Sequence, residues 1–211
     1  MKGESYRMND TPVDCRLLSA ENLDDLLHFM ETDAFSDNPV WRECYCVFHY
    51  LCDKQDGNWT TRTGSENRLA LTQMVKENRG LWILAYRENR IVGWVNADLA
   101  PRLKRYDELG VKADPDTGIV ACFVVDPRFR RTGIASQLLN AAVSALWIRG
   151  AKNADAYVIT DPKRLSETEK DLGADQLAHH GPLTMYLKAG FEVIEQQGPM
   201  SHVRLMKPAN Q

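Results

Sequence analysis

The sequence predicts a mixed α/β (α+β) fold, in which a central mixed sheet is flanked by helices. Amphipathic helical stripes alternate along the chain with short strand-like runs, which is typical of a sheet covered by helices. One run, Ile119–Val125, is apolar throughout and resembles a strand buried on both faces. The length of 211 residues suits a single domain. We therefore expect one domain over residues 13–207 and a flexible N-terminus over residues 1–12.

The first part of the chain predicts a strand, a helix and an irregular segment. The strand covers Val13–Leu18, and Ser19 is the expected N-cap of the helix that follows. Apolar residues in this helix recur at the spacing of one buried stripe, at Leu23, Leu26, Leu27 and Met30. Residues Asp33–Arg62 show no clear period and receive no predicted element.

The middle of the chain predicts a helix and a hairpin. The helix runs from about Ser65 to Asn78. Two strands, Leu81–Tyr86 and Ile91–Leu99, flank the short polar connection Arg87–Arg90, which is typical of a hairpin. We expect Pro101–Pro115 to form a loop or a short helical turn.

The last part predicts a long helix and a C-terminal unit of one helix and several strands. Apolar residues between Ala135 and Trp147 form the buried stripe of the long helix, and Gly150 ends it. The charged segment Asp161–Gln176 is expected to be exposed. The remaining elements are a strand at Ala154–Ile159, a helix near Leu183–Lys188 and strands near Phe191–Glu195 and His202–Met206.

Composition and charge exclude several classes of protein. The formal net charge is −3, from 26 Lys and Arg against 29 Asp and Glu, so there is no basic footprint for nucleic-acid binding. No apolar stretch approaches the about 20 residues of a membrane span, and the first residues lead into no signal peptide. The cysteine count of 5 is odd. We expect reduced thiols in a cytoplasmic protein with neither nucleic-acid nor membrane partners.

The most informative segment is the turn that follows the apolar strand. Its sequence is Val-Val-Asp-Pro-Arg-Phe-Arg-Arg-Thr-Gly-Ile-Ala, from Val124 to Ala135. The first amides of a helix have no internal acceptor and carry the positive end of its dipole, so they attract a pyrophosphate. Gly133 has no Cβ and would let that ligand approach the backbone. Positive charge is added by Arg128, Arg130 and Arg131.

This turn also has an interpretation without a bound phosphate. An ordinary helix start with solvated arginines would show the same lone glycine. The turn is not a P-loop, because no Gly-Lys-Ser/Thr closes it, and it lacks the Gly-x-Gly pair of a dinucleotide fingerprint.

Two blocks of the sequence resemble the GNAT N-acyltransferase superfamily. The block Arg130–Ala135 matches its Arg/Gln-x-x-Gly-x-Gly/Ala signature, and Met185–Val193 is similar to its Tyr-x-Lys-x-Gly-Phe segment. The blocks lie in the expected order, and the predicted elements are compatible along Val13–Met206. The segment Asp33–Arg62 does not match the common core of the family. The resemblance implies the GNAT acyl-CoA N-acyltransferase fold, with a sheet splayed between its fourth and fifth strands.

The resemblance also implies an acyl-CoA co-substrate, most often acetyl-CoA. The amides from Arg131 to Ala135 would hold the pyrophosphate, and the edge of the Ala121–Val125 strand would pair with the pantetheine arm. The implied binding residues are Phe123, Val124, Val125, Arg130, Arg131, Thr132, Gly133, Ile134 and Ala135. The charged segment Asp161–Gln176 contains three cations, Lys163, Arg164 and Lys170. These side chains are either solvated or in contact with the 3′-phosphate of the cofactor.

The reaction that the resemblance implies is direct attack of a primary amine on the thioester. Tyr186 aligns with the tyrosine that is often assigned as general acid in the family. A phenol of pKa about 10 can protonate a thiolate of pKa about 8.5 with a small penalty. The alternative is a core aromatic whose hydroxyl satisfies one hydrogen bond. A backbone N–H near Phe123 or Val124 would hold the oxyanion.

The general base is left open by the sequence. Many family members carry a glutamate on or near the central strand, whereas Ile119–Val125 contains no carboxylate. The candidates are water and four side chains, namely Asp98, Glu43, His49 and His179.

Several cysteines raise further hypotheses. The pattern Cys44-x-Cys46-x-x-His49-x-x-Cys52 offers zinc-type donors, but its spacing is poor. We favour a buried apolar segment that lines the acceptor pocket over a metal site or a reactive thiol, and we assign no metal. Cys122 in the central strand is either a packing residue or the nucleophile of an acyl-enzyme.

The sequence thus favours an enzyme, an acetyl-CoA-dependent N-acetyltransferase acting in a ternary complex. The alternatives are a non-catalytic acyl-CoA sensor and an acyltransferase with another acyl chain or acceptor atom. The acceptor would be a small-molecule or peptide amine, entering near Asp33–Arg62 and Gln196–Ser201. By analogy with the family, a homodimer is compatible with the sequence.

Overall fold

The computed structural model describes residues 12–111, 114–161, 163 and 178–209. Its centre is a seven-stranded sheet of order β1-β2-β3-β4-β5-β7-β6. Strands β4 and β5 run parallel, and the other neighbouring pairs are antiparallel. The strands are β1 (Asp14–Leu17), β2 (Trp82–Arg87), β3 (Arg90–Leu99), β4 (Thr117–Val125), β5 (Asn153–Ile159), β6 (Glu192–Gln197) and β7 (Met200–Met206).

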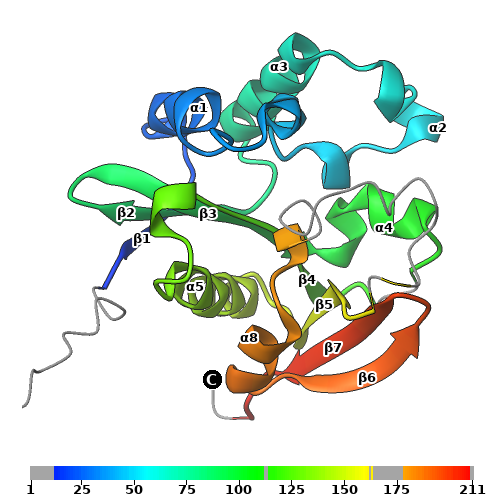
Figure 1. Ribbon diagram of the computed structural model, residues 1–211. Helices are drawn as coiled ribbons and strands as arrows, with labels where there is room; N and C mark the ends of the chain where they lie inside the picture. The colour runs from blue at the N-terminus through cyan, green and yellow to red at the C-terminus, as the bar shows by residue number, and fades with distance from the viewer. Residues whose placement is uncertain (1–11, 112–113, 162, 164–177, 210–211) are drawn as a thin grey trace, which may run out of the picture.

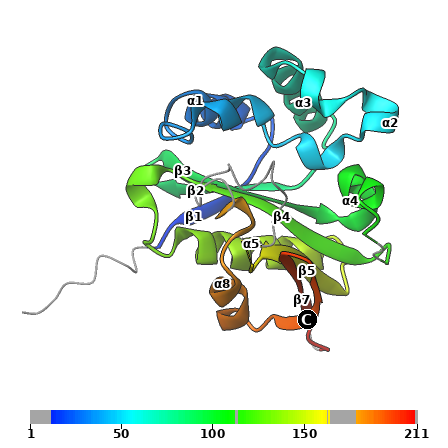
Figure 2. The ribbon, with the colours of Figure 1, turned by 45° about the vertical axis from the view of Figure 1, so that its right-hand side comes forward.

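Helices cover both faces of this sheet, as Figures 1 and 2 show. One face carries α1 (Leu23–Thr32), α2 (Asp53–Asp56), α3 (Gly64–Lys76) and α4 (Lys104–Glu108). The opposite face carries α5 (Ile134–Ile148) and α8 (Leu183–Lys188). The prediction of a mixed α/β fold with a central mixed sheet flanked by helices is confirmed.

Each face of the sheet has its own hydrophobic core. On the α1 and α3 face, Leu26 and Met30 pack with Trp94 of β3, and all three side chains are buried. On the α5 face, Leu138 and Leu146 lie in one cluster with Val95. Burying such a side chain completely contributes about 1.5–3 kcal/mol. The regular apolar spacing in α1 and α5 is therefore what attaches these helices to the sheet.

The helix starts differ from their predicted positions. The predicted N-cap Ser19 is wrong, because α1 begins after Asn22, whose Oδ1 accepts from the Ser19 amide at 2.8 Å. The helix α3 starts at Gly64, before the predicted Ser65. It does so because Thr63 and Glu66 form a capping box, in which each side chain accepts from the other residue's amide.

The sheet divides after Ile119. Strand β4 pairs with β5 through Thr117–Ile119 against Asn153–Asp155, whereas β5 pairs with β7 along its whole length. The register between β3 and β4 shifts between Asn96, which faces Cys122, and Ala97, which faces Val120. Ala121 is therefore an extra residue of β4, and such a bulge bends its strand. This bend directly follows the last β4–β5 pair, and it accounts for the splay that the family resemblance implied.

Three of the sequence predictions lie wholly or partly outside the described residues. They concern the N-terminus, the charged segment that begins at Asp161, and contacts of Arg164 and Lys170. Among the described residues, none of the helices is long and apolar enough to cross a membrane.

Candidate functional site

The turn between β4 and α5 exposes a set of backbone amides. Arg131 has φ +65° and Gly133 has φ +83°, so the backbone visits the left-handed region twice before α5 begins at Ile134. No side chain caps this helix start. Amides of such a turn, together with those of a first helical turn, point at one place and bind anions. The turn therefore has the chemistry that a pyrophosphate requires.

The three arginines of this turn differ in their partners. Arg128 contacts Asp126 and Asp33, each at 2.6 Å. Arg130 forms an ion pair with Asp37 and donates from Nε to the Val125 carbonyl at 3.2 Å. Arg131 is exposed and has no carboxylate partner in the part of the chain that the structure describes. Because carboxylates pair with Arg128 and Arg130, the net positive charge at this turn is smaller than that of three unpaired arginines.

The edge of β4 beyond Ile119 faces the splay. Over Val120–Val125 this strand is paired with β3 but has no partner on the β5 side among the described strands. Cys122, Val124 and Val125 are half-buried, and Phe123 is buried with its ring against Tyr186. A ligand with amide groups can pair with such an edge as a partial extra strand.

Tyr186 lies beside this edge, on the α5 side of the sheet. Its side chain is fully buried, and its hydroxyl donates to the His180 carbonyl at 2.8 Å. Burial raises its pKa well above the ordinary value, and nearby Tyr106 and Cys122 raise it further. The hydroxyl is therefore protonated near pH 7, and its single proton is engaged by a backbone carbonyl.

Three histidines gather around the same region. His179 and His180 belong to a 3₁₀ turn, Ala178–His180, that packs against both β4 and β5. His180 interacts with the Ala121 backbone, and burial lowers its pKa well below the ordinary value. His49 lies next to them: burial, then the charges of His179 and Arg105, lower its pKa to about 3. Both His49 and His180 are therefore neutral near pH 7.

Two of the four predicted base candidates are not in this group. Asp98 is buried and accepts from Arg149 at 3.0 Å and from the Leu99 amide at 2.9 Å. Glu43 is exposed, and its side chain packs against Gly64 at the start of α3. The structure brings His49 and His179 together and leaves the two carboxylates elsewhere.

The thiols near β4 are poorly suited to nucleophilic attack. The Cys122 thiol donates to the Phe123 carbonyl at 3.9 Å, and neighbouring Cys46 together with burial raises the pKa of Cys122 well above the ordinary value. Cys46 also accepts from Asn96 Nδ2 at 3.2 Å. Burial raises the pKa of Cys44 to about 12. A thiol held protonated in this way is a weak nucleophile.

The predicted buried apolar segment is confirmed. Tyr45, Cys46, Val47 and Tyr50 are all buried in the core that underlies α1 and α3. Across the described residues, no group of three or more His, Cys, Asp or Glu side chains is arranged to hold a metal ion.

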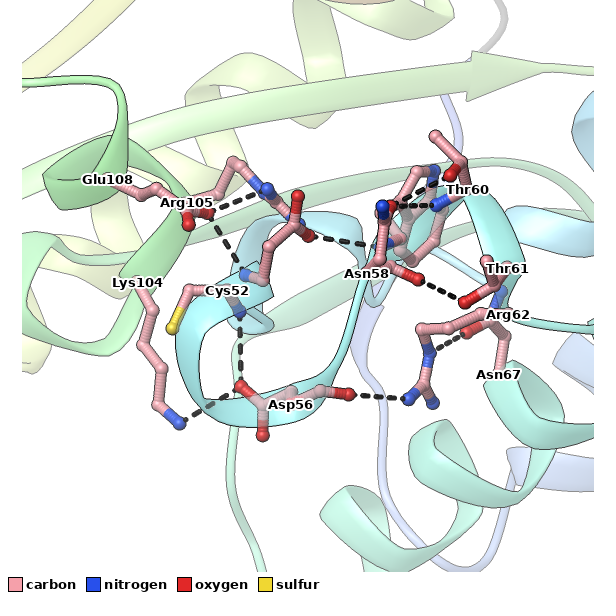
Figure 3. A network of polar contacts seen from close by, with 12 residues as sticks. Cys52, Asp56, Asn58, Thr60, Thr61, Arg62, Asn67, Lys104, Arg105 and Glu108 are labelled. Atoms are coloured by element: carbon pink, nitrogen blue, oxygen red, sulfur yellow. Dashed lines mark hydrogen bonds and ion pairs between the residues drawn. The ribbon is translucent and has the colours of Figure 1, made fainter.

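Arg105 connects the irregular segment to α4, as Figure 3 shows. Its guanidinium donates to Glu108 at 2.7 Å and to Asp53 at 2.9 Å, and it lies 4.6 Å from the centre of the Phe48 ring. Next to it, Lys104 contacts Asp56 at 3.3 Å. These contacts place residues of Asp33–Arg62 directly over α4.

Sequence reasoning missed Tyr106, which follows Arg105 in α4. The Tyr106 ring stacks on His49 with ring centres 5.5 Å apart, and it lies 5.6 Å from the Tyr157 ring. Burial raises the pKa of its hydroxyl, and the charges of Cys122, Tyr157 and Cys46 raise that pKa further. The sequence predicted a loop or a short helical turn at Pro101–Pro115, which includes Tyr106. No motif or spacing in that segment indicated a functional role for the tyrosine.

Comparisons with known proteins agree with this geometry. The family model described as the acetyltransferase (GNAT) family matches residues 38–164. The PaiA N-acetyltransferase from Thermoplasma acidophilum, solved in complex with coenzyme A, is similar at 16% identity and TM-score 0.51, over 93% of this chain and 100% of that chain. A GNAT-family acetyltransferase from Streptococcus pneumoniae has the same values.

A third solved structure is the GNAT domain of PAT from S. lividans. It is 12% identical with a TM-score of 0.53, over 92% of this chain and 90% of that domain. No curated protein matches the sequence. At these identities the solved structures support the fold alone, whereas the family model covers more than half of the chain. On that match, and with the splayed sheet and the turn before α5 in agreement, the chain belongs to the GNAT acetyltransferase family.

Proposed function

We propose that this protein is an N-acetyltransferase that moves the acetyl group of acetyl-CoA to a primary amine by direct attack in a ternary complex. Acetyl-CoA is the co-substrate of the family. One observation carries the proposal: beyond Ile119, the edge of β4 that has no partner strand among the described residues leads directly into the amide-rich turn before α5. The two features together suit a ligand with an amide-containing arm and a diphosphate.

The residues fit such a ligand in two places. At the turn, the amides from Arg131 to Ala135 would hold the pyrophosphate, with the side chain of Arg131 free of any carboxylate among the described residues. Along the strand, the backbone of Phe123, Val124 and Val125 would pair with the pantetheine arm. Arg130 and Thr132 support the turn, because they donate to the carbonyls of Val125 and Phe129.

Bound acetyl-CoA would supply a thioester carbonyl as the electrophile, so that an N–C bond forms, a C–S bond breaks, and one proton passes overall from the amine to the sulfur. We assign Tyr186 as the proton donor, since its ring packs against that of Phe123 on this edge, with ring centres 6.5 Å apart. The His180 carbonyl holds this hydroxyl in place between turnovers. Its proton must leave that carbonyl before it can serve the sulfur.

For the general base we propose water, because a pKa of about 3 makes the His49 imidazole too weak a base near pH 7. The imidazole of His49 is buried and neutral, and it forms part of the wall of the site. It stacks on Tyr106 on the face that carries the irregular segment. That face is where we propose that the amine enters, over Asp33–Arg62 and α4. The amine need not be strongly cationic, because Arg105 and Lys104 balance the carboxylates of this region.

The test is release of free CoA from acetyl-CoA in the presence of a panel of mono-, di- and polyamines and peptides with free amino groups. We expect at least one amine to be consumed with one CoA released for each acetylated product, measured by thiol assay and mass spectrometry. Calorimetry gives acetyl-CoA affinity in parallel. Tight acetyl-CoA binding without CoA release would instead support the sensor hypothesis.

A further inference from the structure

Tyr106 has a buried hydroxyl that meets no protein partner. The residue is 6% exposed, and its Oη has no hydrogen-bond partner within the described residues. Leaving a buried hydroxyl unpaired costs about 1–3 kcal/mol. A phenylalanine would fill the same space without that cost. A ligand group that accepts a hydrogen bond explains why a tyrosine is tolerated here.

The surroundings show where such a ligand group would lie. Tyr106 packs in one hydrophobic cluster with Cys46, Ala121 and Cys122, and its ring centre lies 5.6 Å from that of Tyr157. Cys122 stands in the middle of the free edge of β4. Tyr106 and Tyr186 therefore approach this edge from opposite faces of the sheet, Tyr106 from α4 and Tyr186 from α8.

The two hydroxyls differ in how their protons are used. A phenol has one proton to donate, and that of Tyr186 goes to the His180 carbonyl. The proton of Tyr106 is not given to any described residue. Tyr106 is thus the hydroxyl that can donate to a new group without first breaking a bond.

We propose that Tyr106 is a further catalytic residue, whose hydroxyl donates a hydrogen bond to the thioester carbonyl oxygen as negative charge develops on it. This role rests on the proposed acetyl transfer. A donor aimed at a developing oxyanion acts where water is excluded and needs no rearrangement during the reaction. Tyr106 would act together with a backbone N–H of β4, near Phe123 or Val124.

The local structure holds the ring in this position. His49 stacks on one side of the Tyr106 ring at an interplanar angle of 19°, and Tyr157 contacts it at 5.6 Å between ring centres. The preceding residue, Arg105, is fixed by Asp53 and Glu108. A donor whose ring is packed on two sides and whose helix is anchored is preorganised, which is what makes such a hydrogen bond effective in catalysis.

The experiment compares Tyr106→Phe with Tyr86→Phe, a control tyrosine of β2 whose hydroxyl donates to Asp25 at 3.3 Å. We expect Tyr106→Phe to lower kcat about 100-fold, the loss typical of one oxyanion donor. Acetyl-CoA affinity by calorimetry should stay within about twofold. Free energy of unfolding should be unchanged or higher, because the lost hydroxyl had no partner. Tyr86→Phe should keep kcat within about twofold of the wild type.

The shape of the pH profile separates this role from proton transfer. A hydrogen-bond donor that keeps its proton leaves the shape of the kcat profile unchanged in Tyr106→Phe. Full kcat in Tyr106→Phe would overturn the assignment, as would a loss of kcat that is matched by lost stability or lost acetyl-CoA affinity. If the wild type releases no CoA with any amine of the panel, the proposed function fails and this role fails with it. If the wild type is active and Tyr106→Phe is equally active, the role of Tyr106 is wrong while the proposed acetyl transfer stands.

Discussion

The hydroxyl of Tyr186 and the carbonyl oxygen of His180 are joined by a 2.8 Å hydrogen bond. The bond ties α8 to the 3₁₀ turn that lies between β4 and β5. The residue that we assign as proton donor therefore also supports the wall of the site. Substitutions of Tyr186 should affect both stability and turnover.

For Tyr186→Phe we expect a loss of about 1–2 kcal/mol in the free energy of unfolding, because a buried carbonyl loses its donor. We expect kcat to fall about 100-fold, as for loss of a general acid. Urea unfolding and steady-state CoA release measure the two effects. The contrast with Tyr106→Phe is direct, since that variant should lose turnover without losing stability. Unimpaired turnover in Tyr186→Phe would remove its assignment as the acid.

Gly133→Val tests the amide-rich turn. A β-branched residue at φ +83° is strained, so the turn should distort and acetyl-CoA affinity should fall at least tenfold by calorimetry. Gly150→Val is the matched control, because Gly150 has φ +91° just after the same helix and open space around its missing Cβ. It should cost comparable stability and leave acetyl-CoA affinity unchanged. Equal affinities in the two variants would argue against diphosphate binding at this turn.

Arg105→Ala tests the connection between the irregular segment and α4. The Arg105 side chain is 8% exposed and serves two carboxylates, so its loss should cost about 2 kcal/mol of unfolding free energy. We expect the KM for the amine to rise more than the affinity for acetyl-CoA falls, since the amine face is the one that loosens. Lys104→Ala, which removes an exposed pair with Asp56, should cost under about 1 kcal/mol. Identical behaviour of the two variants would contradict the role of Arg105 as the anchor.

The buried His49 should make the protein less stable as the pH falls. Burial lowers its pKa to about 3, whereas an unfolded histidine has a pKa of about 6.5. Below about pH 6.5, His49 therefore binds a proton in the unfolded chain but stays neutral in the folded chain. The free energy of unfolding should then fall with decreasing pH, by up to about 1.4 kcal/mol per pH unit for this one group.

Urea unfolding at pH 7.5, 6.5 and 5.5 measures this slope for the wild type and for His49→Phe. The variant keeps an aromatic ring against Tyr106 and should show the shallower slope. Other titrating groups contribute to both proteins, so the difference isolates His49. Parallel slopes would show that the folded and unfolded forms of His49 bind protons equally.

Much of the fold is predictable because it depends on local spacing. The apolar run at Ile119–Val125 and the apolar stripes of α1 and α5 are patterns within a short stretch of sequence, and such patterns predict which residues are buried. The structure confirms these three elements. The turn before α5 is readable for the same reason, because a helix start and a left-handed glycine are properties of neighbouring residues.

The acceptor side could not be predicted because contacts between distant residues build it. Arg105 meets Asp53 across 52 positions, and Asn96 reaches Cys46 across 50. The segment Asp33–Arg62 forms short 3₁₀ turns, whose apolar residues do not recur at a regular spacing. The sequence therefore could not predict which face of the sheet its aromatic residues cover. The position of Tyr106 in one hydrophobic cluster with Cys46 and Cys122 follows from these contacts and from no local pattern.

The bulge at Ala121 has a mechanical consequence as well. Strands β5, β7 and β6 are hydrogen-bonded to one another, yet their backbone pairing with β4 consists of three residue pairs at one end. So short a pairing supplies few backbone hydrogen bonds between the two parts of the sheet. Their alignment therefore also depends on the 3₁₀ turn Ala178–His180, which contacts both β4 and β5, and on the packing of Tyr186 against Phe123.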